Sequence, residues 1–187
     1  MVKINIGTNT FVYPNPVTLL GANVEGRANF MPLGWVSRVN AEPPYIGIGV
    51  NKVHHTIRGI LENKTFSINF PDADMVEVTD YCGLVSGKTT DKSQVFETFY
   101  GELKTAPMVK ECSLSLECKL IDRIDLPTNI FFIGEIIASY TDEKYLTDGK
   151  LDIKKMNPLL LSMPDNCYWT VGKYVGKAWN IGKKADV

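Results

Sequence analysis

The sequence has few of the residues from which metal sites and redox dithiols are built. Among its 187 residues are four cysteines, which are widely spaced and form no CxxC pair, and two histidines, His54 and His55. Structural zinc sites need closely spaced Cys and His ligands, and dithiol redox centres need two neighbouring cysteines. The sequence therefore predicts no metal site and no dithiol centre.

A long hydrophobic run and a strong net charge are also missing. No apolar stretch reaches the roughly 18 residues of a membrane-spanning helix, and residues 1–17 lack the basic and apolar regions of a secretory signal. The formal net charge is -1, so electrostatics give no indication of a nucleic-acid partner. We therefore expect a cytoplasmic protein with one domain over residues 1–187, no membrane association and no nucleic-acid partner.

The motifs of several familiar enzyme classes are incomplete or absent. The segment 83–90, GLVSGKTT, ends like a phosphate-binding P-loop, but only three residues separate Gly83 from Gly87, and the residues before it have a helical pattern. The segment 47–52, GIGVNK, lacks the third glycine of a dinucleotide fingerprint. No serine lies in a GxSxG elbow. We predict no catalytic side chain, which favours chemistry carried by a bound cofactor.

The apolar segments that are present have the length and period of β-strands. Residues 16–24, 28–39 and 45–50 are β-rich and separated by turn residues. Residues 65–70 alternate, and so do residues 114–120, where Ser115, Glu117 and Lys119 are expected on a solvent face. Residues 130–140 are almost continuously apolar, with a bulge or bend expected at Gly134. We predict a mainly β fold, an antiparallel, Greek-key-like barrel with a few short helices.

Two helices and several loops complete this prediction. Ile57, Ile60 and Leu61 have helical spacing within residues 54–62, and a second helical pattern covers residues 72–87 and ends at Gly87. We expect a loop with a further helical turn over residues 88–101, a hairpin-like loop over residues 141–152, and an aromatic, glycine-rich tail over residues 167–184.

The order of these segments resembles the flavin reductase-like family. The resemblance covers essentially the whole chain and rests on several motifs in order: PNPVTLLGA, NFMPLGWVS, PPYIGIGVNKVHHTIRGI, TFSINFP, DYCGLVSGKTTDK, LSLECKL, FIGEI and VGKYVGKAWNIGK. It implies an FMN-binding split barrel that forms a homodimer. It also implies electron transfer through noncovalent FMN, with NAD(P)H, another flavin, ferric iron or a redox protein as the electron donor or acceptor.

The same resemblance assigns residues to the FMN phosphate. A phosphate binds hydroxyls, amides and cations, and Thr56 at a predicted helix start can offer a hydroxyl and free N–H groups. Lys52, His55 and Lys92 are candidate cations near it, although both lysines also fit a reading as solvated surface residues. Asn51 is a further cofactor-binding candidate.

Further candidates are assigned to the flavin ring. The resemblance also implies, beside the phosphate end, a hydrogen bond from Asn29 to FMN and a phosphate or ring contact from Trp35, although a tryptophan on a strand also suits a core position. Cys82 could take part in redox chemistry or be a small buried residue. The proline in FMPLGW removes one backbone donor. The remaining ring candidates are Met31, Pro32, Leu33, Gly34, Tyr81, Gly83, Ser86 and Asn129.

Two alternatives remain open at this stage. The protein could be an FMN-binding electron carrier with no reactivity toward nicotinamides. The pocket could also hold another ligand such as haem, for which the two adjacent histidines are the candidate imidazole ligands.

Overall fold

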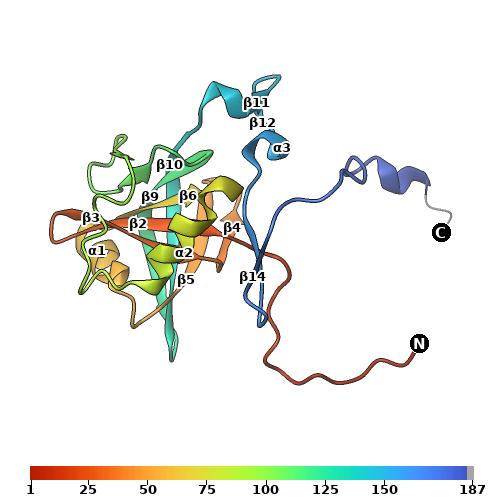
Figure 1. Cartoon of the computed structure of the whole chain (residues 1–187), viewed down its shortest axis with the longest axis horizontal. Helices are drawn as coiled ribbons and strands as arrows, with labels where there is room; N and C mark the ends of the chain where they lie inside the picture. The colour runs from red at the N-terminus through yellow and green to blue at the C-terminus, as the bar shows by residue number, and fades with distance from the viewer. Residues whose placement is uncertain (185–187) are drawn as a thin grey trace.

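Seven antiparallel strands form the main sheet of the protein in this computed structural model, which describes residues 1–184 (Figure 1). Their order in the sheet is β3-β2-β6-β9-β10-β5-β4, so that strands distant in sequence become neighbours. The prediction of a mainly β, antiparallel fold with a few short helices is confirmed. The strands are β2 (Thr18–Val24), β3 (Arg27–Leu33), β4 (Val36–Asn40), β5 (Tyr45–Asn51), β6 (Thr65–Phe70), β9 (Leu114–Asp125) and β10 (Asn129–Tyr140).

The sheet surrounds one apolar core to which almost every strand contributes. Phe66, Ile48 and Phe132 are fully buried and come from β6, β5 and β10. Each such side chain stabilises the fold by about 1.5–3 kcal/mol relative to an exposed position. The alternation read from the sequence therefore identifies the inward faces of these strands.

One strand boundary differs from the prediction. Residues 28–39 form two strands instead of one, because the chain turns at Gly34, whose carbonyl oxygen accepts from the Val36 N–H at 3.1 Å. The expected bulge at Gly134 is confirmed. An added Cβ there would lie 2.4 Å from the ring of Phe66, so the strand passes too close to β6 for a side chain. A second bulge follows Ile136.

The helices are α1 (Thr56–Asn63), α2 (Val76–Leu84) and α3 (Ile153–Met156), with a short 3-10 helix, η1 (Ala73–Met75), leading into α2. The expected helix at residues 54–62 is confirmed within two residues. The second helix was expected to end at Gly87, and this is wrong. It ends at Leu84 because Val85 is extended, and this frees the next residues to form a loop.

The solvent face predicted for residues 114–120 is also wrong in part. Lys119 is exposed, but Ser115 and Glu117 are buried. The Glu117 carboxylate accepts hydrogen bonds from the backbone N–H groups of Glu102 and Leu103, at 3.1 and 2.7 Å, and from the Tyr140 hydroxyl. The loop that contains Glu102 and Leu103 thus covers the Glu117 side chain, which the alternating pattern alone would place in solvent.

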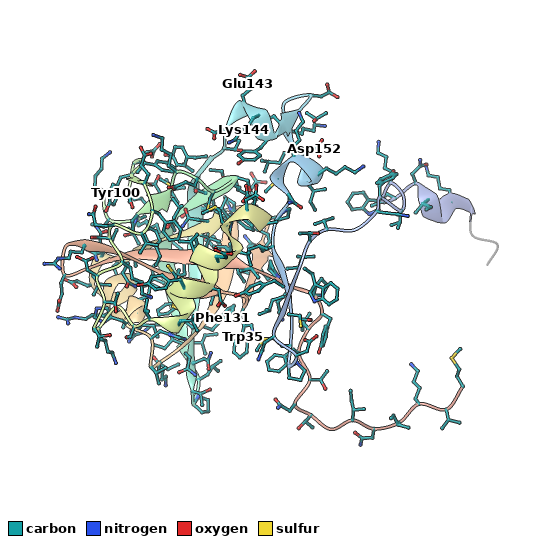
Figure 2. All side chains as sticks on the ribbon, viewed as in Figure 1. Trp35, Tyr100, Phe131, Glu143, Lys144 and Asp152 are labelled. Carbon is teal, nitrogen blue, oxygen red and sulfur yellow. The ribbon has the colours of Figure 1, made fainter. Side chains whose placement is uncertain are left out.

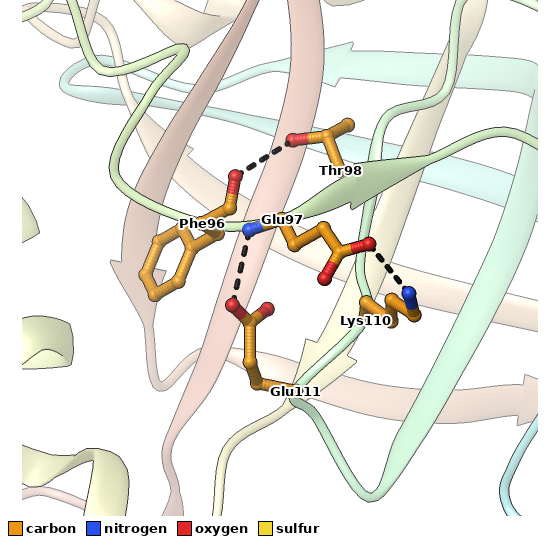
Figure 3. Close-up of polar contacts among 5 residues, drawn as sticks. All are labelled: Phe96, Glu97, Thr98, Lys110 and Glu111. Atoms are coloured by element: carbon orange, nitrogen blue, oxygen red, sulfur yellow. Dashed lines mark hydrogen bonds and ion pairs between the residues drawn. The ribbon is translucent and has the colours of Figure 1, made fainter.

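Residues 88–112 form this covering segment, and they contain no helical turn. Two short strands, β7 (Thr98–Phe99) and β8 (Met108–Val109), pair within it. Figure 3 shows its polar anchors, where the Glu97 backbone N–H donates to Glu111 and the Glu97 carboxylate pairs with Lys110. Phe96 is buried and packs edge-on against Phe30 of β3 at 5.4 Å between ring centroids. These contacts fix the segment that leads from α2 back to the barrel.

A small sheet lies where both ends of the chain meet the body. It consists of β1 (Asn15–Pro16), β13 (Leu160–Ser162) and β14 (Cys167–Trp169), in the order β1-β13-β14. The predicted hairpin is β11 (Leu146–Thr147) with β12 (Lys150–Leu151), preceded by η2 (Glu143–Tyr145). Residues 1–14 and 170–180 run outward from this sheet, and η3 (Ile181–Lys184) follows (Figure 1). None of the helices within residues 1–184 is long and apolar enough to cross a membrane.

Candidate functional site

A pocket of about 290 Å³ opens between β3, the start of α1 and the loop after α2. The loop exists because α2 ends early, at Leu84. One wall is largely apolar and includes Pro32, Val53 and Leu84. The full lining is Asn29, Met31, Pro32, Val53, His54, His55, Thr56, Cys82, Gly83, Leu84, Val85, Ser86, Gly87 and Lys92.

A second, more polar pocket of about 440 Å³ adjoins the first. Its basic side chains are Arg27, Lys88 and Lys92, and its hydroxyls are those of Thr89 and Thr90. Glu25 and Asp91 also line it, and Arg27 pairs with Asp91 at 3.2 Å between Nη1 and Oδ2. The two pockets share four residues, so one elongated site runs from an apolar end to a cationic end. The shared residues are Asn29, His55, Gly87 and Lys92.

Asn29 and Thr56 form the polar floor where the two halves meet. Both are buried, and the Asn29 Nδ2 atom donates to the Thr56 Oγ1 atom at 2.7 Å. Thr56 is the first residue of α1, and no side chain caps this helix at His55. The first-turn N–H groups of such a helix favour a bound anion. Asn29 and Thr56, which are expected from the sequence near the same end of the ligand, therefore lie together.

Gly87 brings the loop backbone against this floor. A Cβ at Gly87 would lie 2.2 Å from the Asn29 Oδ1 atom, so no other residue fits without movement. The loop closes on itself at Ser86, whose carbonyl oxygen accepts from the backbone N–H groups of Thr89 and Thr90 at 3.0 and 2.9 Å. Its hydroxyls and cations therefore gather at one end of the site.

Lys92 is buried at the junction of the two halves. Its Nζ atom donates to the carbonyl oxygens of Phe30 and Cys82, at 3.0 and 2.7 Å, and so ties β3 to α2. The reading of Lys92 as a solvated surface lysine is therefore wrong. An ammonium has three N–H donors, which leaves one beyond these two bonds. Burial lowers the pKa of Lys92 from its ordinary value.

The pKa values of two residues near Lys92, His54 and Cys82, are shifted by burial and by the charge of Lys92. Burial and, secondarily, the charge of Lys92 lower the pKa of His54. Burial raises the pKa of the Cys82 thiol, and Lys92 offsets this only in part. The lowered pKa favours the neutral form of His54 and the raised pKa favours the thiol form of Cys82. Cys82 is 1% exposed, which agrees with its reading as a small buried residue.

The structure gathers nine of the sixteen predicted cofactor residues at this site: Asn29, Met31, Pro32, His55, Thr56, Cys82, Gly83, Ser86 and Lys92. Gly34 instead packs against Asn15, and Leu33 lies in the core. Lys52 pairs with Asp125 at 3.5 Å between Nζ and Oδ1. The other four residues also lie outside the lining of both pockets: Trp35, Asn51, Tyr81 and Asn129.

Several lining residues were not predicted. Arg27 is the first residue of β3 and precedes the candidate residues on that strand. Thr89 and Thr90 lie in the loop whose sequence ends like a P-loop. The density of glycine, lysine and threonine in that loop is a signal that could have identified it. The remaining unpredicted residues are Val24, Glu25, Ala28, Val53, His54, Leu84, Val85, Gly87, Lys88 and Asp91.

The arrangement suits a ligand with an anionic end and a flat apolar end. The residues of the site offer hydroxyls, amides and cations, and the other polar groups are a thiol, two histidines and the carboxylates of Glu25 and Asp91. Within residues 1–184, no group of three or more His, Cys, Asp or Glu residues is placed to hold a metal ion. Fold and site together define a split β-barrel with a binding site between the barrel wall and a glycine-containing loop.

Comparison with known proteins identifies the family of this barrel. The flavin reductase-like domain model matches residues 10–162, and the chain belongs to that family. The chain is similar to the flavoredoxin of Methanosarcina acetivorans, with 65% identity, a TM-score of 0.96 and coverage of 98% of each chain. The flavoredoxin of Desulfovibrio vulgaris (Miyazaki F) is 34% identical, with a TM-score of 0.90, over 97% of this chain and 100% of that one. The resemblance inferred from the sequence motifs is confirmed.

A more distant structure shares the fold alone. The FMN-binding protein from Thermus thermophilus, with bound p-hydroxybenzaldehyde, is 23% identical, with a TM-score of 0.79, over 95% of this chain and 98% of that one.

Proposed function

We propose that the protein binds FMN noncovalently in the two-part site and transfers electrons through it. The observation that carries this proposal is the division of one continuous site into a polar half and an apolar half, the latter with Pro32 and Val53. In the polar half the basic residues Arg27, Lys88 and Lys92 outnumber the acidic residues Glu25 and Asp91. FMN has the same division, since a phosphate of nearly two negative charges is linked to a flat ring system. The similarity to two flavoredoxins supports this assignment.

The residues present fit the phosphate in three ways. Gly87 leaves space at the loop backbone that any Cβ would fill. The uncapped start of α1 at Thr56 presents N–H groups. Lys92, held by two carbonyl oxygens, keeps one further N–H donor and a positive charge at the junction. Hydroxyl, amide and cationic donors together are the set that a phosphate needs.

The bound flavin supplies the redox chemistry, and the protein supplies binding, orientation and the electrostatic environment. Lys92 and the cations of the polar half favour the negatively charged end of the ligand. Cys82 is kept as a thiol by burial, which makes it a wall of the site and not a nucleophile. The polar side chains of the site thus hold the cofactor without reacting with it.

Removal of the two exposed cations tests the assignment of the phosphate end. The double variant Arg27→Gln with Lys88→Gln is expected to weaken FMN binding about tenfold, because two charge-assisted contacts are lost. Riboflavin, which lacks the phosphate, is expected to bind both proteins equally. Titration of flavin fluorescence measures both ligands. Lys119→Gln with Lys150→Gln, two exposed lysines outside both pockets, is the matched control.

Equal FMN affinity of the Arg27 and Lys88 double variant and the natural protein would contradict the phosphate assignment. Weaker binding of riboflavin as well would mean that the loop itself had changed.

The partner that reduces the flavin separates two forms of this proposal. Under the first, NADH or NADPH reduces the bound flavin, which passes electrons to another flavin, to ferric iron or to a redox protein. Under the second, the protein is an electron carrier with no nicotinamide reactivity. Anaerobic stopped-flow mixing with NADH and with NADPH distinguishes them: rapid loss of the flavin absorbance supports the reductase, and a persistent oxidised spectrum supports the carrier.

We also propose that the protein is a homodimer. The outer face of β10, β5 and β4 carries Trp35 and Val39, which are 48% and 46% exposed, and Figure 2 shows Trp35 and Phe131 at this part of the body. The side chains of Phe131 and Val39 pack directly over Gly47, since an added Cβ there would lie 2.4 Å from the Phe131 ring and 2.8 Å from Val39. A contiguous apolar face of this kind is typical of a protein interface.

A further inference from the structure

The N-terminal arm, residues 1–14, has the pattern of a strand but no strand to pair with among the residues described. It belongs to no helix or strand and runs away from the body (Figure 1). Val2, Ile4 and Ile6 are 94%, 79% and 74% exposed, and polar residues alternate with them. A period of two is the pattern of a strand that buries one face. The arm therefore carries an apolar face that its own body does not cover.

The body has a matching vacant edge and cleft. β4 is the last strand of the seven-stranded order, and its outer edge has no partner strand within residues 1–184. Beside it lies a cleft of about 580 Å³ with apolar walls from Val36, Leu116 and Ile136, and with Pro16 on its lining. An unpaired edge next to an apolar cleft can accept an added strand, whose backbone pairs with the edge while alternate side chains enter the cleft.

The root of the arm shows an unsatisfied group. Asn15 is 7% exposed, and its Nδ2 atom has no hydrogen-bond partner in the part of the chain that is described. It packs against Gly34, which directly precedes Trp35 and β4. Buried amide donors in native proteins nearly always have an acceptor, in protein or in ordered water, so the Asn15 Nδ2 group is available to a further partner at the root of the arm.

The direction of the arm favours a second copy of this chain as the partner. The arm runs away from its own body (Figure 1), so the edge and cleft that it can fill belong to another molecule. Two copies can make this contact reciprocally, since the same molecule carries arm, edge and cleft.

We propose that the N-terminal arm of one copy adds as a strand to the β4 edge of a second copy and places Val2, Ile4 and Ile6 in its cleft. The exchange is reciprocal across a twofold axis. This inference rests on the proposed homodimer and names the segment that holds it together.

The test compares the two faces of the arm in the full chain without added flavin. The triple variant Val2→Ser, Ile4→Ser, Ile6→Ser is expected to raise the dimer dissociation constant by at least about tenfold, because three buried apolar side chains are lost. The double variant Lys3→Ser with Asn5→Ser, which changes the opposite face, is expected to stay within about twofold. Sedimentation velocity measures the dissociation constant, starting from a natural protein of twice the 20.9 kDa chain mass.

The acceptor side is tested in the same way. Ile137 lines the cleft and is 36% exposed, so Ile137→Ser is expected to weaken the dimer without unfolding the chain. Ile153→Ser, at an exposed position on α3 outside the cleft, is the control.

A natural protein that is monomeric at about 100 μM would overturn both the dimer and the exchange. A dimer that the triple variant leaves unchanged would overturn the exchange alone. FMN titration of the same samples reports separately on the proposed function, so failure of one proposal is distinguishable from failure of the other.

Discussion

At the scale of single residues, buried polar side chains fix the segments that surround the barrel. Glu117 receives two backbone N–H groups and the Tyr140 hydroxyl, and Asn69 accepts from the Val109 N–H at 3.0 Å while donating to the Leu19 carbonyl oxygen. Loops have no ladder of their own, so their backbone groups need such partners. These two side chains attach residues 101–109 to the sheet.

Replacement of Glu117 tests this anchoring. Glu117→Ala leaves two backbone donors and a hydroxyl without their acceptor, and we expect the free energy of unfolding to fall by about 3 kcal/mol. Urea denaturation followed by circular dichroism measures the change. Lys119→Ala, at the exposed position two residues along β9, is expected to change stability by less than about 0.5 kcal/mol. Equal effects of the two substitutions would contradict the anchoring role.

These polar residues also show where sequence reasoning at this scale stops. Alternation in residues 114–120 places Glu117 opposite the core correctly, but it does not reveal that residues 101–103 cover that side. The burial of Lys92 was missed for the same reason, since its two acceptors lie on β3 and α2, far from it in sequence. Burial of a polar residue depends on segments distant in sequence, which a local pattern does not record.

At the scale of elements, α1 places Thr56 at the site by packing closely on β2. An added Cβ at Gly59 would lie 2.2 Å from the Asn23 carbonyl oxygen, so the helix approaches the strand backbone directly. Asn63 adds a hydrogen bond from its Nδ2 atom to the same carbonyl oxygen at 2.9 Å. The position of the helix start at the pocket follows from this contact.

Enlargement of Gly59 tests the close approach. Alanine is the better helix former by about 1 kcal/mol in an exposed helix, yet we expect Gly59→Ala to destabilise the protein by about 2 kcal/mol, because the clash is with backbone that cannot turn aside. It is also expected to weaken FMN binding by moving Thr56. Thermal unfolding and flavin titration measure the two effects. A more stable Gly59→Ala protein would contradict this packing, and Arg58→Ala on the exposed face is the control.

Strands and helices were predictable from the sequence where the hydrophobic period and the segment length indicate the same element. The residues at which these elements end were not predictable in the same way. The cores of β5, β6, β9 and β10 follow from apolar periodicity and turn residues. The end of α2 was misplaced because Gly87 suggested a helix cap, whereas it serves the close contact with Asn29. A glycine is required for either purpose, and only the partner segment decides which one applies.

At the scale of the whole molecule, the site depends on four segments that meet only in the folded chain: β3, the start of α1, the end of α2 and the loop to Lys92. The sequence pointed to nine of its lining residues through the family resemblance, and to few of them through chemistry alone. Trp35 and Asn129, which the resemblance assigned to the cofactor, line neither pocket.

The central claim is that this site binds FMN, and titration of the flavin-free natural protein with FMN tests it most directly. We predict saturable binding at one FMN per chain, with a change in flavin fluorescence and in the visible spectrum. A protein that leaves the spectrum and fluorescence of added FMN unchanged, while circular dichroism shows it folded, would contradict the account.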